Sequence, residues 1–114
     1  MSTTLQNLLE SQRKFDEAHA AGIPFFVKIG KENIEELEHL LVCILGELGE
    51  FSNLVKKVRR GDVEFDDVKP ALDEEIVDVF IYLLKIANQF DVDLESGYKT
   101  KMQKNVRRFS KFER

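Results

Sequence analysis

The sequence predicts an all-α fold, a four-helix, bundle-like single domain over residues 1–114 with antiparallel helices. Apolar residues recur at every third or fourth position along extended stretches, which is the helical period. Patterns typical of strands are nearly absent. The breaks between the periodic stretches are short, which favours antiparallel neighbours in a bundle.

The first helix is expected to begin near Thr3, because Thr3 and Gln6 have the spacing of a capping box. A helical period of apolar residues follows. The helix is expected to end before residues 22–24, Gly-Ile-Pro, since glycine and proline stop helices. The connector at residues 25–29 is too apolar for a flexible linker, so we expect it to pack against the helices.

Three further helices are predicted, each with a recognisable boundary. They run from after Gly30 to about Arg60, from near Asp67–Pro70 to about Phe90, and from Asp93 to the C-terminus. Gly61 is the expected stop of the second helix. Proline is tolerated in a first turn, which suits Pro70, and aspartate is a good N-cap residue.

Composition narrows the class of protein. With 17 basic and 21 acidic residues the net charge is -4, so we expect no nucleic acid polymer as partner. The N-terminus lacks the pattern of a signal peptide. No stretch approaches the roughly 18 apolar residues that span a bilayer. The single cysteine, Cys43, fits a reducing compartment. We therefore expect a cytoplasmic protein without membrane contact and, at this size, a homodimer or homotetramer.

The most informative residues are acids on the apolar faces of two helices. At about 100° per residue, Leu40 and Leu54 lie within about 40° of Glu47. Glu47 is thus near the middle of the apolar stripe of the second helix, and Glu50 lies one turn on, at its edge.

The third helix repeats this arrangement. Val68 and Tyr82 lie within about 40° of Glu75, and Asp78 is its neighbour at the edge of the stripe. Two helices therefore each direct an acid-x-x-acid pair toward the interior. The four acids are Glu47, Glu50, Glu75 and Asp78.

Four carboxylates that face the interior lose their hydration and repel one another, and positive charge must offset this cost in free energy. Lysine or arginine side chains in buried salt bridges are one solution. The same spacing on two helices favours a hard divalent cation instead, because oxygen ligands alone select Mg²⁺, Mn²⁺ or Ca²⁺. We expect Mg²⁺, with Mn²⁺ as a possible substitute. Four acids exceed what one structural ion needs, which indicates several ions and a polyphosphate substrate.

Four stretches of this sequence resemble the MazG family of all-α nucleotide pyrophosphohydrolases, which is related to dCTP pyrophosphatases and dimeric dUTPases. They are GELGEF at 46–51, KKVRRG at 56–61, EIVDVFIYLL at 75–84 and KMQKNVRRF at 101–109. The family pattern, an ExxE on one helix and an ExxD on the next, is matched by the four acids.

The resemblance implies Mg-dependent hydrolysis of a nucleoside or deoxynucleoside triphosphate to the monophosphate and pyrophosphate, in nucleotide-pool house-cleaning. The four acids would be both the metal ligands and the catalytic residues, and Glu50 is our choice for orienting the attacking water. The family also builds its sites beside a subunit interface.

Four residues are candidates for substrate binding. Tyr82 lies one turn after Asp78 on the same face, as a core aromatic or a substrate contact. The resemblance favours phosphate or sugar contacts for Lys101 and Asn105. Arg108 shares their helix face, where a solvated basic side chain is the simpler interpretation.

Nucleobase recognition would involve the N-terminal third, although core packing is the simpler interpretation for most of its aromatic residues. The candidates there are Phe15, His19, Phe25 and Phe26.

Two other functions remain open. A non-catalytic helical dimerisation or nucleotide-binding module would keep the same acids. A di-iron carboxylate bundle uses Glu-x-x-His pairs, and the chain contains Asp16-x-x-His19 and Glu36-x-x-His39. These pairs leave the four acids unexplained.

Overall fold

The computed structural model describes residues 3–114. Its helices are α1 (Leu5–Glu17), α2 (Ile34–Arg60), α3 (Phe65–Phe90) and α4 (Leu94–Arg108), with short 3₁₀ helices at Lys31–Asn33 and Ser110–Phe112. The predicted all-α, bundle-like class is confirmed, and the described residues form no strand beyond an isolated bridge between Ala20 and Pro24. None of these helices is long and apolar enough to cross a membrane.

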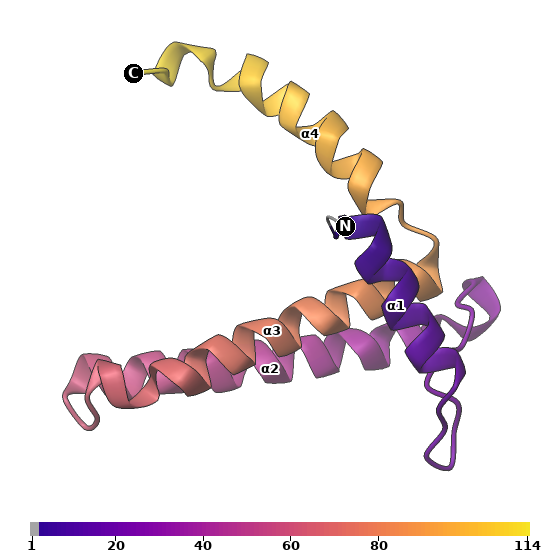
Figure 1. Cartoon of the computed structure of the whole chain (residues 1–114), viewed down its shortest axis with the longest axis horizontal. Coiled ribbons are helices and arrows are strands. Elements are labelled where there is room, and N and C mark those ends of the chain that lie inside the picture. The colour runs from indigo at the N-terminus through magenta and orange to yellow at the C-terminus, as the bar shows by residue number, and fades with distance from the viewer. Residues whose placement is uncertain (1–2) are drawn as a thin grey trace.

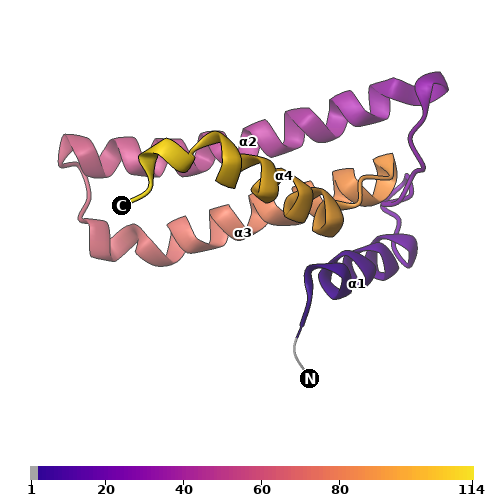
Figure 2. The same ribbon diagram turned by 90° about the horizontal axis from the view of Figure 1, so that it is seen from above.

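Helices α2 and α3 form a long antiparallel hairpin that is the body of the molecule (Figure 1, Figure 2). Gly61 ends α2 as predicted. Its φ of 81° is left-handed, and its N–H bonds to the carbonyls of Lys57 and Val58. Glycine adopts this conformation without the steric cost that a Cβ brings.

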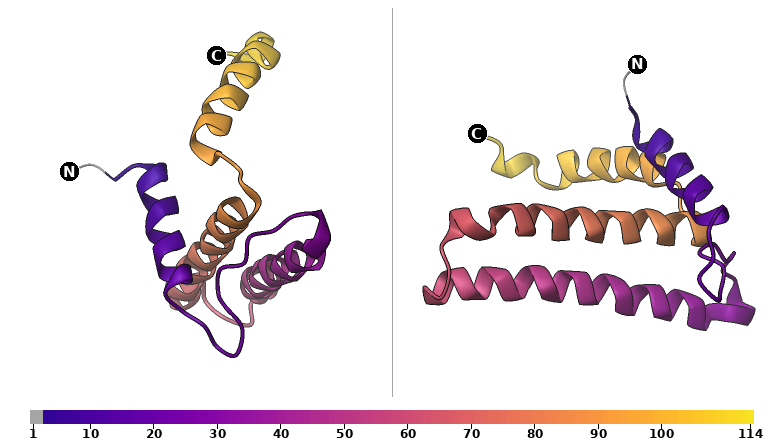
Figure 3. Two further views of the ribbon diagram at one scale, coloured as in Figure 1. Left: turned by 90° about the vertical axis from the view of Figure 1, so that its right-hand side faces the viewer. Right: turned by 60° about the horizontal axis from the view of Figure 1, so that its bottom comes forward.

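Helix α1 packs near the C-terminal end of α3, at one end of the hairpin (Figure 1). A small core forms there, in which Leu9 of α1 is buried against Leu84 and Ala87 of α3. Leu5 and Leu94 cover this core. Helix α4 therefore starts beside α1 and then diverges from the hairpin (Figure 3).

Two predicted helix starts need correction. The capping box of α1 uses Thr4 and Asn7 rather than Thr3 and Gln6: the Thr4 hydroxyl accepts from the Asn7 N–H at 3.1 Å, and the Asn7 side chain accepts from the Thr4 N–H at 3.0 Å. Helix α3 already begins at Phe65, so Pro70 lies in its second turn. Proline removes a single helical hydrogen bond there, which the rest of a 26-residue helix outweighs.

The start of α4 is confirmed, whereas its end is not. Asp93 is the N-cap, and its carboxylate accepts from the Ser96 N–H at 3.0 Å. Backbone hydrogen bonding also lowers the pKa of the Asp93 carboxyl. The α-helix stops at Arg108 and tightens into a 3₁₀ turn instead of reaching the C-terminus.

The connector between α1 and α2 is held onto α3. The Ile29 N–H donates to the Gln89 carbonyl at 2.8 Å, and the Gln89 side chain donates to the Phe25 carbonyl at 3.3 Å. Ile29 and Gln89 are both buried. These bonds place the connector over the C-terminal half of α3, where a cavity opens.

Candidate metal and substrate site

Three of the four acids meet across the α2–α3 hairpin. Glu47 comes from α2, and Glu75 and Asp78 come from α3. One carboxylate oxygen from each of the three lies within 4.8 Å of the others. We call this group the acid cluster. Among the described residues it is the single group of three or more potential metal ligands.

Helical periodicity explains this convergence. Leu40 and Leu72 are buried, and the apolar positions of α2 and α3 that share their faces lie between the two helices. Glu47, Glu75 and Asp78 are half-buried on the same faces. Two antiparallel helices in contact must therefore bring these carboxylates together about midway along the hairpin.

Glu75 shows that the acid cluster carries unbalanced negative charge. Its Oε2 is inaccessible to solvent and has no hydrogen-bond donor among the described residues. The neighbouring carboxyl of Glu47 raises the pKa of Glu75 from 4.5 to about 7, and burial and Glu50 add to this effect. Two carboxyls this close share a proton or require a cation.

Glu50 stands at the rim of the acid cluster. It is exposed and does not belong to the three-residue group, yet it lies near enough to Glu75 to raise its pKa. All four acids thus occupy one region. Three face the interior of the hairpin, and the fourth faces water.

The acid cluster fits a hard divalent cation. Its donors are carboxylate oxygens alone, which suit Mg²⁺ or Mn²⁺ and not the softer metals that prefer sulfur or imidazole. No ion pair of the described residues includes Glu47, Glu75 or Asp78. Lysine or arginine side chains therefore do not offset these charges. The solvent-excluded Oε2 of Glu75 is an oxygen that could serve as a ligand of a cation.

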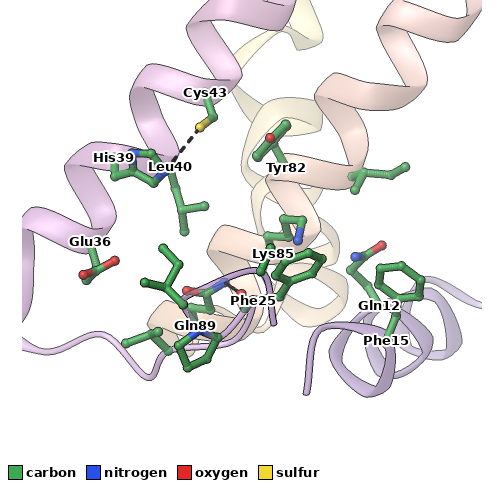
Figure 4. Close-up of a pocket in the computed structure, with 15 residues that line it drawn as sticks. Gln12, Phe15, Phe25, Glu36, His39, Leu40, Cys43, Tyr82, Lys85 and Gln89 are labelled. Atoms are coloured by element: carbon green, nitrogen blue, oxygen red, sulfur yellow. Dashed lines mark hydrogen bonds between the residues drawn. The ribbon is translucent and has the colours of Figure 1, made fainter. Parts of the chain in front are cut away.

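A cavity of about 680 Å³ lies beside the acid cluster, between α1, the connector, α2 and α3. Figure 4 shows Cys43 and Tyr82 at one side of the cavity and Phe15, Phe25 and Gln89 at the other. The Cys43 sulfur is 3.8 Å from Nε2 of His39. The cavity is of the size that holds small-molecule ligands and cofactors.

Tyr82 joins the cavity to the acid cluster. It lines the cavity, and burial raises the pKa of its hydroxyl, with further contributions from Cys43, Glu47 and Asp78. Tyr82 therefore lies between the two regions, at a position from which it can contact a ligand that extends from one to the other.

The aromatic candidates of the N-terminal third separate into two groups. Phe15 and Phe25 line the cavity, and His19 stacks on Phe15 with ring centroids 4.1 Å apart. Phe26 instead lies under the guanidinium of Arg13, outside the cavity lining.

The α4 candidates are not brought to the acid cluster. Lys101 is exposed, the Asn105 amide contacts the Met102 sulfur at 3.9 Å, and Arg108 stacks on Phe109. No hydrogen bond or ion pair among residues 3–114 links Lys101, Asn105 or Arg108 to the four acids. Within one chain, α4 diverges from the hairpin (Figure 3).

Three polar residues of this region were not predicted from the sequence as a group. Asp16 is fully buried and bonds to Lys85 and Gln12, and both of these side chains line the cavity. The sequence does contain one indication that Asp16 faces the interior. Asp16 falls within about 40° of Leu5 and Leu9 on a helical wheel, as Glu47 falls on the stripe of α2.

The structure does not favour the di-iron alternative. Asp16 forms an ion pair with Lys85, and His19 is engaged in aromatic stacking. Glu36 and His39 line the cavity, but neither joins a group of metal ligands in the described part of the chain.

Comparisons with known proteins identify the family of this chain. The model of the MazG nucleotide pyrophosphohydrolase domain matches residues 35–112. The chain is 34% identical over 82 residues to dCTP pyrophosphatase 1 of Homo sapiens, covering 68% of this chain and 48% of that protein. It is 34% identical over 75 residues to the Gene 37 protein of Mycobacterium phage L5, covering 64% and 66%. No solved structure matches the chain.

The chain thus spans about half the length of the human relative and less than two thirds of the phage relative. The matched region contains the four acids, whereas α1 and the connector lie outside it. Because the family model covers more than half of the sequence and includes the acid cluster, this chain belongs to the family of the MazG nucleotide pyrophosphohydrolase domain.

Proposed function

We propose that this protein is a magnesium-dependent hydrolase that converts nucleoside or deoxynucleoside triphosphates to the monophosphate and pyrophosphate. The acid cluster is the observation that carries this proposal, because three half-buried carboxylates converge without a protein cation. Family membership supports nucleotide hydrolysis, and the name of the human relative supports a dNTP substrate such as dCTP.

In this proposal the four acids hold the metal and the cavity holds the nucleoside. A bound Mg²⁺ would neutralise charge on the phosphates and lower the pKa of the attacking water. Glu47, Glu75 and Asp78 would fix its position. Glu50 is the exposed acid, so it is the group best placed to accept a proton from water at its carboxylate.

The remaining candidates have supporting roles. Tyr82 would contact the sugar or the α-phosphate, because it lies between the cavity and the acid cluster. Phe15 and Phe25 would provide apolar surface for a base. Lys101, Asn105 and Arg108 remain proposed phosphate or sugar contacts. We also propose that the protein is a homodimer or homotetramer and that it acts in nucleotide-pool house-cleaning.

A substrate panel tests the proposed function. The protein is incubated with ribo- and deoxyribonucleoside triphosphates and Mg²⁺, with and without EDTA, and pyrophosphate release is measured. We expect release that EDTA abolishes. Folded protein that releases no pyrophosphate from any member of the panel would favour the non-catalytic nucleotide-binding module.

Variants of the acid cluster locate the activity. Glu47→Gln and Asp78→Asn are each expected to lower kcat by at least about 100-fold, because metal ligands act on the transition state. Glu74→Gln is the matched control, since Glu74 is an exposed carboxylate next to Glu75. A variant that retains full Mg-dependent turnover would remove its residue from the site.

A further inference from the structure

A buried ion pair lies in the wall of the cavity. Asp16 of α1 is 0% exposed, and its Oδ1 lies 2.7 Å from Nζ of Lys85 on α3. The Gln12 amide donates to the same oxygen at 3.1 Å. Asp16 Oδ2 is also inaccessible to solvent and has no donor among the described residues.

The positive partner of this pair faces the cavity. Lys85 and Gln12 line it, whereas Asp16 lies behind them. Figure 4 shows Lys85 between Phe25 and Tyr82, and the Lys85 ammonium is 5.4 Å from the centre of the Phe25 ring. A lysine ammonium has three donors, and the single bond to Asp16 leaves two for a ligand.

A purely structural role does not explain this pair well. Burying two charges costs desolvation energy that their attraction only partly returns, and apolar residues of similar size often stabilise a protein better. The core of Leu9, Leu84 and Ala87 already joins α1 to α3. The desolvation cost of the pair is better explained if Lys85 presents a fixed hydrogen-bond donor to a ligand inside the cavity.

Position and charge indicate what Lys85 contacts. Lys85 is seven residues beyond Asp78, about 10 Å along the helix axis, so it lies away from the place where phosphates would meet metal. Asp16 also neutralises its charge. A neutral acceptor is therefore a better partner than a phosphate, and a carbonyl oxygen on a nucleobase is such an acceptor.

We propose that Lys85, positioned by Asp16, is a specificity residue that donates a hydrogen bond to a carbonyl oxygen of the substrate's base. Uracil, thymine, cytosine and guanine carry such an oxygen, and adenine does not. The inference rests on the proposed function for its substrate. It assigns selectivity to residues 16 and 85, of which the first lies outside the region shared with the family.

Inosine triphosphate and ATP test the proposal, because they have the same size and differ at the N1–C6 edge, where inosine has a carbonyl oxygen. We expect kcat/KM to favour inosine triphosphate by at least about tenfold, as for a hydrogen bond to a charged donor. Equal kcat/KM values for the two substrates in the wild-type protein would overturn the proposal.

The decisive variant replaces both charges. Lys85→Met alone leaves the buried Asp16 carboxylate with the Gln12 amide but without its cation, and it is expected to destabilise the protein. The double variant Lys85→Met with Asp16→Asn removes both charges at similar volume, and folding is checked by circular dichroism. We expect the preference for inosine triphosphate to fall to about one. A folded double variant that keeps the wild-type preference would overturn the proposal.

Two further variants distinguish a loss of base specificity from a general loss of activity. Lys28→Met removes an exposed lysine that pairs with Asp91 outside the cavity lining, and it is expected to leave the preference unchanged. Asp16→Asn alone is expected to raise KM for inosine triphosphate with little change in kcat, because it loosens a donor that acts in binding. A loss confined to kcat would contradict this positioning role.

A binding experiment distinguishes this inference from the proposed function. Inosine and adenosine carry no phosphate, so their binding in EDTA is measured by saturation-transfer NMR without hydrolysis. Tighter binding of inosine that requires Lys85 would support the inference even if no triphosphate is hydrolysed. Triphosphate hydrolysis without base preference would support the function and overturn the inference. Neither hydrolysis nor binding would overturn both.

Discussion

Glu47 and Glu75 approach each other from neighbouring helices. One carboxylate oxygen of each lies within 4.8 Å of the other and of an oxygen of Asp78. No lysine or arginine of the described residues pairs with either. The approach raises the pKa of Glu75 to about 7. Without metal, this part of the hairpin therefore depends on a proton to limit repulsion.

The first prediction concerns stability and pH in the absence of metal. Between pH 4.5 and about 7 the folded protein holds a proton on Glu75 that the unfolded chain releases. The free energy of unfolding then decreases as pH rises through this window. We expect the melting temperature in EDTA to be lower at pH 8 than at pH 5.5.

Glu75→Gln isolates this contribution from other groups that titrate in the same range. We expect the variant to melt a few degrees higher than wild type at pH 8 in EDTA, because an uncharged amide replaces the repelled carboxylate. At pH 5.5 the two proteins should melt at similar temperatures. Parallel pH profiles for both would show that Glu75 does not titrate as described.

The second prediction concerns metal addition. A cation that binds the folded protein alone stabilises it by about 2.7 kcal/mol when its concentration is 100 times Kd. We expect Mg²⁺ to raise the melting temperature at pH 8 and to do so less at pH 5.5, where protons compete for the carboxylates. Glu75→Gln should weaken this response, and Glu74→Gln should keep it. An equal response in all three proteins would place the ion elsewhere.

Much of this site follows from sequence periodicity. Glu47, Glu75 and Asp78 lie on the apolar faces of two adjacent helices, and Glu50 lies at the edge of one of them. A short turn makes those helices antiparallel neighbours, so local pattern alone brings Glu47 near Glu75. The family match then confirms the resemblance found in the same residues.

The cavity could not be predicted from the sequence, because it depends on contacts between segments that are distant along the chain. Its shape depends on the path of the connector, which Gln89 fixes through the Phe25 carbonyl across 64 residues of chain. Asp16 was similarly uninterpretable without Lys85, which lies 69 residues away. Buried pairs between distant segments are set by tertiary packing, which helical periodicity does not describe.

A third prediction tests the end of α2. Gly61 has φ of 81°, so Gly61→Ala should destabilise the protein by about 1 kcal/mol, because a Cβ disfavours the left-handed conformation. Gly97→Ala is the contrasting variant: Gly97 lies within α4, an added Cβ meets no atom within 4 Å, and alanine favours helix by about 0.5 to 1 kcal/mol. Urea unfolding measures both, and a loss of stability for Gly97→Ala would contradict this account of the two glycines.

The last prediction concerns association. A second apolar stripe of α2 is exposed, on the face that lies about 80° to 160° around the helix from Glu47. It consists of Leu41, Leu45, Leu48 and Val55. On α3, Ile76, Phe80 and Leu83 form a comparable stripe. We expect sedimentation equilibrium at micromolar concentration to give at least twice the 13.2 kDa of one chain.

Leu45→Lys tests whether the stripe of α2 is the contact. Leu45 is 64% exposed in one chain, so a lysine there should leave the fold intact and shift the protein toward monomer by burying a charge in the interface. Asn53→Lys adds the same charge on another face of α2 and should not change the mass. If Leu45→Lys associates as the wild type does, another surface holds the copies together. If wild type sediments at 13.2 kDa, the stripe is exposed to water in the native protein.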